Sequence, residues 1–173
     1  MTDEPEEKPW NGGACGRDGL KFATALISFQ RFSRPVGDVV EGAPRSLGAL
    51  PVGRAASGFL LPVADNEAFW IGAMLSRDPD PDSVTIMADR LTGGRVCVAR
   101  LDRRQTTIIA GMIRPDGRFD IFSRHSISAI EATAHGRTVR VEPVDPALYA
   151  AVTGDRAAEP LDPAAGFGGW RLP

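Results

Sequence analysis

The stretch SVTIMADRLTGGRVCVARLDRRQTTIIAGMIRPDGRFDIF, residues 83–122, holds the clearest evidence for the fold. Three runs rich in β-branched residues, SVTIMA, GRVCVARL and QTTIIAGMIR, are separated by the short polar stretches DRLTGG and DRR. RPDGR follows as a tight turn, because Gly117 can adopt the positive φ that such turns need, and FDIF continues a hairpin. Short strands joined by turns predict an all-β structure.

Runs on either side of this stretch extend the pattern. We predict strands in LKFATALISFQR (20–31), GFLLPV (58–63), EAFWIGAML (67–75) and HGRTVRVEPV (135–144), and an edge strand in GFGGWRLP (166–173). DPALYAAV predicts a short helix, with Asp145 as its cap and Pro146 in its first position. We therefore expect an all-β fold, a β-sandwich or open barrel of about seven to nine short strands with one short helix.

The length and composition indicate one domain. A chain of 173 residues suits a single core, and 43% hydrophobic with 24% charged residues is typical of a soluble globular protein. Residues 1–19 are acidic and hold little to bury, which predicts a disordered or loosely attached tail before a single β-rich domain at 20–173. From Ser33 to Ser57, many Pro and Gly residues predict a long ordered crossing, which could be a lid or a cover for the core.

Compartment and partner class follow from what is missing. No run approaches the ~18 apolar residues of a membrane span, and the acidic start does not resemble a secretory signal, so we expect a cytoplasmic protein without a membrane partner. Cys15 and Cys97 form no C-x-x-C pair, so we predict no disulfide framework and expect Cys97, inside VCVARL, to be buried.

Charge argues against a nucleic-acid partner, because the net charge is -2 and the pI is near 5.7. The distribution is uneven, with ten arginines against four acids between Arg90 and Arg140. Two interpretations stay open for the arginines at strand ends and turns, a solvated rim or a basic face for an anionic partner. These are Arg95, Arg100, Arg103, Arg104, Arg114 and Arg118.

Glu67 is the most prominent candidate for a functional side chain. In LPVADNEAFWIGAML (61–75) it stands beside Phe69 and Trp70 in an otherwise apolar run. In a strand, Glu67 and Phe69 share one face and Trp70 points to the other. A partly desolvated carboxylate could act as a general acid or base, or anchor a ligand. The usual explanation of such a carboxylate is structural, in that it accepts backbone N–H bonds or pairs with an arginine.

Several short motifs occur in order along the chain, FQRFSRP, LGALP, PVADNEAFW and the late TG and FGG. They resemble a family of uncharacterised bacterial and fungal proteins with F-Q-R-x-x-R-x-P, L-G-x-x-P, P-x-x-x-x-E-A-x-W, T-G and F-G-G elements. The resemblance implies a shared β-rich domain and no catalytic residue. The matching positions are Phe29, Gln30, Arg31, Arg34, Pro35, Leu47, Gly48, Pro51, Pro62, Glu67, Ala68, Trp70, Thr153, Gly154, Phe167, Gly168 and Gly169.

The joint occurrence of these motifs leads to a specific expectation. We expect Glu67 to organise the fold or a ligand by pairing with Arg31 or Arg34, while Trp70 packs on the opposite face. We name no catalytic residue.

Other chemistry finds weaker support. The acids Asp78, Asp80, Asp82 and Asp89 superficially resemble a calcium loop, but Ser83 stands where the turn needs Gly, so we predict no metal site.

His125 and His135 are the only histidines, which excludes a three-histidine zinc site within one chain. SRHSIS around His125 does not predict a catalytic triad, and His135 before Gly136 suits a turn. Nucleotide-binding motifs are missing, so we predict no cofactor.

Three functions from different classes remain. The first is a non-enzymatic binding or accessory domain that engages a protein or a small ligand. The second is an enzyme with Glu67 as general acid or base, supported by His125 or an arginine. The third is a self-assembling structural subunit, which requires an exposed sheet edge.

Overall fold

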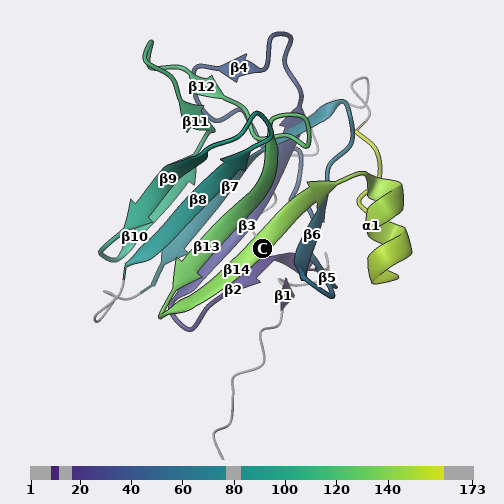
Figure 1. Ribbon diagram of the computed structural model, residues 1–173, viewed down its shortest axis with the longest axis horizontal. Coiled ribbons are helices and arrows are strands. Elements are labelled where there is room, and N and C mark those ends of the chain that lie inside the picture. Colours follow the sequence, from purple (N-terminus) through teal and green to yellow (C-terminus); the bar gives the residue numbers. More distant parts are fainter. Residues whose placement is uncertain (1–8, 12–16, 77–82, 162–173) are drawn as a thin grey trace, which may run out of the picture.

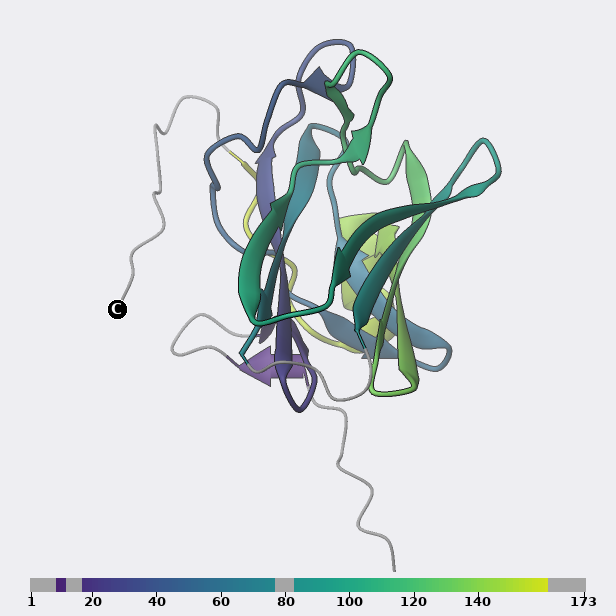
Figure 2. The same cartoon turned by 90° about the vertical axis from the view of Figure 1, so that its left-hand side faces the viewer.

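A computed structural model describes residues 9–11, 17–76 and 83–161. Its strands form two larger sheets, which lie side by side as layers in Figure 2, and a small third sheet at one end (Figure 1). The prediction of an all-β, sandwich-like fold is confirmed, and the sheets do not close into a barrel.

The five-stranded sheet is antiparallel throughout, in the order β1–β2–β3–β7–β10. The pairing of β3 with β7 runs from Ala25 opposite Leu75 to Ser33 opposite Glu67. It therefore brings the start of β7 to the end of β3, where the functional candidates lie. The strands are β1 (Pro9–Asn11), β2 (Arg17–Lys21), β3 (Ala25–Ser33), β7 (Glu67–Leu75) and β10 (Gln105–Ile109).

The six-stranded sheet has the order β5–β6–β14–β13–β8–β9, with β6 and β14 parallel and the other pairs antiparallel. The three-stranded sheet, ordered β11–β12–β4, lies at the end of the sandwich shown at the top of Figure 1. The remaining strands are β4 (Val39–Val40), β5 (Gly53–Ala55), β6 (Gly58–Pro62), β8 (Val84–Arg90), β9 (Arg95–Leu101), β11 (Met112–Ile113), β12 (Phe119–Asp120), β13 (Ile127–Ala134) and β14 (Arg137–Val144).

The helix α1 (Pro146–Thr153) begins as predicted. The Asp145 carboxylate accepts a hydrogen bond from Ala147 N at 2.8 Å, and Pro146 occupies the first turn. The helix ends at Gly154, whose φ of 72° is the left-handed conformation common after a helix. It packs beside β5 and β6 and buries Tyr149.

The main core lies between the two larger sheets. Alternation along β3 and β7 turns Phe29 and Phe69 inward, where both are fully buried. Phe69 meets Phe29 edge-on at 5.8 Å between ring centroids and stacks on Phe122 at 5.7 Å. Each such ring contributes roughly 1.5–3 kcal/mol through its burial, so these three aromatic residues anchor this end of the sandwich.

The crossing from Ser33 to Ser57 covers part of the fold. On the outer face of the five-stranded sheet, a second apolar cluster forms from Phe32, Ala68 and Ile121. Trp70 packs against this cluster and donates its indole N–H to the carbonyl of Pro44, 2.8 Å away. The crossing therefore lies over buried apolar side chains as a cover, and it contributes the short strands β4 and β5.

The sequence pattern alone does not predict β13, although it lies between β14 and β8 inside the six-stranded sheet. Its sequence, ISAIEATA, is rich in Ala and contains Glu, residues that are depleted in strands. Pairing on both edges and burial of Ile127, Ile130 and Ala132 outweigh that weak local preference. Here tertiary packing determines the secondary structure.

Other boundaries also differ from expectation. The predicted strand at 20–31 is interrupted by a turn in which Phe22 N donates to Ala25 O, so β2 ends before β3 begins. The expected tail contributes β1 and the start of β2 at Arg17. Residues 1–8 and 12–16 lie outside the described residues, as does the predicted edge strand at 166–173. Within the described residues nine strands have five residues or more and five are shorter. The expected burial of Cys97 is wrong, because it is exposed on β9, an edge strand.

Candidate functional site

Glu67 lies at the first position of β7 with its side chain turned to the core, and the residue is only 2% exposed. Its Oε1 accepts a hydrogen bond from Arg31 Nη1 at 3.1 Å, and its Oε2 accepts one from Ala64 N at 3.2 Å. Glu67 N in turn donates to Ala64 O at 3.1 Å, which closes the turn before the strand. Both carboxylate oxygens are thus engaged within the protein.

Arg31 connects this carboxylate to a third segment. The same Nη1 donates to the carbonyl of Glu159 at 2.7 Å, and the Arg31 side chain is 13% exposed. The pair therefore ties β3, β7 and the chain after α1 together. Burial of both partners in a hydrogen-bonded geometry is typical of a structural ion pair.

Arg34, the other arginine considered as a partner, does not meet Glu67. Its Nε and Nη2 bind both oxygens of Asp38, at 2.6 and 2.7 Å. The hydrogen bond from Arg34 lowers the pKa of Asp38 and the same bond raises the pKa of Arg34. Asp38 has a φ of 58°, so this pair holds an unusual turn at the start of the crossing.

His125 contacts a different acid, Asp65, just before the start of β7. Its Nε2 is 2.7 Å from Asp65 Oδ1, and the Arg124 guanidinium contacts the same oxygen. The hydrogen bond to His125 is the main cause of the lowered pKa of Asp65. Ser123 Oγ instead contacts Ser126 Oγ at 3.3 Å and accepts from His125 N, so its hydroxyl does not meet the imidazole as a triad would require. His135 has a φ of 51° and forms a turn, as expected.

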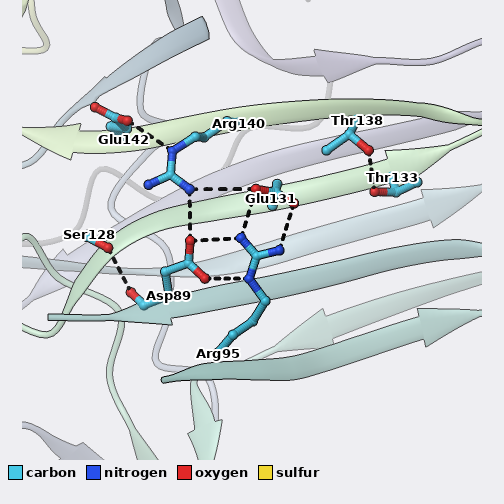
Figure 3. Close-up of polar contacts among 8 residues, drawn as sticks. All are labelled: Asp89, Arg95, Ser128, Glu131, Thr133, Thr138, Arg140 and Glu142. Atoms are coloured by element: carbon cyan, nitrogen blue, oxygen red, sulfur yellow. Dashed lines mark hydrogen bonds and ion pairs between the residues drawn. The ribbon is translucent and has the colours of Figure 1, made fainter. Parts of the chain in front are cut away.

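The outer face of the six-stranded sheet carries a lattice of alternating charges (Figure 3). Arg95 on β9 binds Asp89 on β8 and Glu131 on β13, with N–O distances from 2.7 to 3.1 Å. Arg140 on β14 binds Asp89 at 2.8 Å and Glu142 at 3.0 Å. The bond from Arg95 is the largest cause of the lowered pKa of Asp89. This charge lattice joins four neighbouring strands, and each of its two arginines binds at least two of its three acids.

The arginines between Arg90 and Arg140 do not form one basic face. Arg95 and Arg140 belong to the charge lattice, while Arg114 binds Asp120 at 2.9 Å and Arg118 binds Asp116 at 2.7 Å. Arg100, Arg103 and Arg104 lie at the end of β9 and in the turn that follows it. The local excess of positive charge is therefore divided among several places, and much of it is neutralised within the fold.

A shallow apolar hollow of about 330 Å³ opens where the crossing leaves β3. None of its lining residues was singled out as a binding residue by sequence, although the apolar positions in the Pro-rich crossing are the signal that could have indicated it. The lining residues are Phe32, Ser33, Pro35, Val40, Pro44, Arg45 and Leu47.

An exposed apolar row continues from this hollow. Register places Val40 of β4 opposite Phe119 of β12, and Phe119 opposite Ile113 of β11. Directly paired residues point to the same side of a sheet, so the three side chains form one row. Ile113 is 68% exposed, and Phe119 and Val40 are partly exposed. The hollow and this row together, which we call the apolar groove, form the candidate binding site.

Neither a metal-ligand cluster nor a membrane-spanning helix occurs within the described ranges 9–11, 17–76 and 83–161. No group of three or more His, Cys, Asp or Glu side chains there could hold a metal ion. Of the calcium-like acids, Asp78, Asp80 and Asp82 lie outside these ranges, and Asp89 belongs to the charge lattice. No helix within the described ranges is long and apolar enough to cross a membrane.

No family model, curated protein or solved structure matches this chain.

Proposed function

We propose that this protein is a non-enzymatic binding domain that engages an apolar segment of a protein partner through the apolar groove. The observation that carries the proposal is the continuity between the hollow of about 330 Å³ and the row Val40–Phe119–Ile113. An apolar surface that extends from a hollow across a small sheet is typical of an interaction site.

The shape of the groove favours a protein segment over a small ligand. Ligand pockets usually span about 300–1,000 Å³ and enclose most of the ligand, so this hollow is at the lower limit. The apolar surface of the groove continues outward from the hollow to Ile113. A compact ligand bound in the hollow would leave Ile113 uncovered. A partner chain can place one side chain in the hollow and cover the row with the next.

An enzyme that uses Glu67 is the weaker alternative. A general acid or base must reach the proton that it transfers, yet Glu67 is buried and each oxygen already accepts a hydrogen bond. His125 is held by Asp65 rather than by Glu67. These contacts support a structural role for Glu67, Arg31 and Trp70, and a role for Arg34 in shaping the turn beside the groove.

We also propose a cytoplasmic location. Cys97 is a free cysteine exposed at the edge of a sheet, which suits a reducing compartment. Fractionation of host cells tests this, and recovery of the protein outside the cytoplasm would contradict it.

Selection from a displayed library of random 12-residue peptides tests the binding function. We expect enrichment of peptides with aromatic and large aliphatic residues. Ile113→Asp should weaken their binding at least about tenfold, because one buried apolar side chain contributes roughly 1.5–3 kcal/mol. Leu148→Asp is the matched control, since Leu148 is also exposed, at 51%, but lies on α1.

The outcomes separate clearly. Loss of binding in the Ile113 variant with retention in the Leu148 variant supports the apolar groove as the site. Equal binding by both variants, or failure to enrich any peptide, contradicts the proposal.

A further inference from the structure

The edge strands of the two larger sheets differ in how well they are protected from pairing with another chain. An edge strand presents backbone N–H and C=O groups that a further strand can bind, and proteins usually prevent this with charges, proline, bulges or short strands. The edges of the described sheets are β1 and β10 in one and β5 and β9 in the other. Both β9 and β10 lie along the left-hand side of Figure 1, which faces the viewer in Figure 2.

Three of these edges carry such protection. β1 begins with Pro9 and has an irregular register with β2 after Trp10. β5 has only three residues and lies beside α1. β9 carries Arg95 and Arg100, and its register with β8 shifts part-way along the pair. The sequence of β10, QTTII, holds no charge, proline or glycine, and its register with β7 is regular. Among the described edges, β10 is therefore the unprotected one.

Two residues of β10 direct their backbone groups out of the sheet. Phe69 N donates to Phe122 O at 2.9 Å, on the side of β7 that faces away from β3, and every second residue of β7 after Phe69 points the same way, toward β10. The residues of β10 opposite these groups are Gln105, Thr107 and Ile109. Thr106 and Ile108 therefore point their N–H and C=O outward, where no backbone partner lies within residues 9–11, 17–76 and 83–161.

The side chains of the same two residues are also exposed. Register places Thr106 beside Met74 and Ile108 beside Gly72, on the outer face of the five-stranded sheet. Ile108 is 58% exposed and Met74 is 39% exposed. Because Gly72 has no side chain, nothing from β7 covers Ile108 at this position. A large aliphatic side chain thus lies beside open backbone groups, and covering it would be favourable.

We propose that β10 pairs in antiparallel fashion with β10 of a second copy of this chain, about a two-fold axis through Thr107. In this register, Thr106 of one copy exchanges both backbone hydrogen bonds with Ile108 of the second copy, and the reverse pair does the same. The two Ile108 side chains become diagonal neighbours within reach of each other. The edge is self-complementary, because its open groups satisfy one another and no like charges meet. A two-fold pairing of this kind closes on itself as a dimer.

Sedimentation of the full chain over a range of concentrations tests the pairing. We expect the mass to double with rising concentration. Ile108→Lys should raise the dissociation constant of the dimer at least about tenfold, because it removes the apolar contact and brings two positive charges together. Thr106→Pro should do the same, since proline removes the outward N–H and no bond to β7. Leu148→Lys is the matched control, because Leu148 is also exposed, at 51%, but lies on α1.

Cysteine cross-linking tests the register. In a chain with Cys15→Ser and Cys97→Ser, the further change Thr107→Cys places two thiols opposite each other across the axis. The Cα atoms of such a non-hydrogen-bonded pair are about 4.5 Å apart, which a disulfide can bridge. We expect a disulfide-linked dimer on oxidation. Thr106→Cys is the control, because its thiol lies opposite Ile108 of the second copy.

The outcomes decide the proposal. It is supported by a doubled mass that Ile108→Lys and Thr106→Pro reduce and Leu148→Lys does not, with cross-linking through Thr107→Cys. It is overturned by a monomer at every concentration up to about 1 mM, by equal association of Ile108→Lys and the parent, or by stronger cross-linking of Thr106→Cys. Peptide binding plays no part in these measurements, so the dimer and the binding function stand or fail separately.

Discussion

Arg31 and Glu67 face each other at the end of the sandwich, with Nη1 and Oε1 3.1 Å apart and both side chains largely buried. The pair joins adjacent strands of the five-stranded sheet, and through Glu159 it also holds the chain that follows α1. It lies beside the apolar groove without lining it. Its chemistry is therefore best explained as support for the binding site.

Removal of one partner from this pair should destabilise the fold strongly. Arg31→Met leaves the Glu67 carboxylate buried without its cation, and we expect a loss of about 3–5 kcal/mol in the free energy of unfolding. Urea unfolding measures this. Arg118→Met is the control, because Arg118 and Asp116 form an exposed pair whose loss should change the free energy of unfolding far less. Similar losses in the two variants would contradict a special role for Arg31.

The charge lattice predicts a pH-dependent contribution from Asp89. We expect Asp89→Asn to lower the free energy of unfolding by about 1–2 kcal/mol at pH 7, since Asp89 binds two arginines. The folded-state pKa of Asp89 is lowered, so the stabilisation is present above the unfolded pKa of about 3.9 and is lost as the pH falls through the folded value. The difference between variant and parent should shrink below about pH 4. A difference that stays constant down to pH 2 would show that ionisation is not its cause.

Trp70 should control how tightly the crossing is held. Trp70→Phe keeps an aromatic ring against the second apolar cluster but removes the hydrogen bond to Pro44 O, which typically contributes about 1 kcal/mol. We expect faster amide hydrogen exchange in residues 36–47 with little change in the core strands. Unchanged exchange in the crossing would argue against this anchoring role.

Gly111 should be essential for the small sheet that carries the apolar row. A Cβ at this position would lie 2.2 Å from the backbone oxygen of Asp120, a contact that requires the backbone to shift. We expect Gly111→Ala to separate β11 from β12 and to weaken peptide binding at least as much as Ile113→Asp does. Gly42→Ala is the control, because its Cβ would meet nothing within 4 Å. Equal peptide binding by the two glycine variants would contradict the proposed geometry.

Local sequence was sufficient for much of the secondary structure. β7 has the bounds of the run EAFWIGAML, since alternating apolar residues bury one face of a strand. The helix α1 begins where Asp145 and Pro146 predict, because capping depends on neighbouring residues only. β13 could not be predicted in this way, because its Ala-rich sequence is stabilised by neighbours on both sides.

The sequence by itself determined an all-β chain with Glu67 and Trp70 on opposite faces of one strand, since side-chain alternation is a local property of strands. Only the tertiary structure decided that Arg31 pairs with Glu67 and that Arg34 pairs with Asp38. It also brought Val40, Phe119 and Ile113 into one row from three separate strands. Strand order and register are set by contacts between distant segments, which no local pattern records.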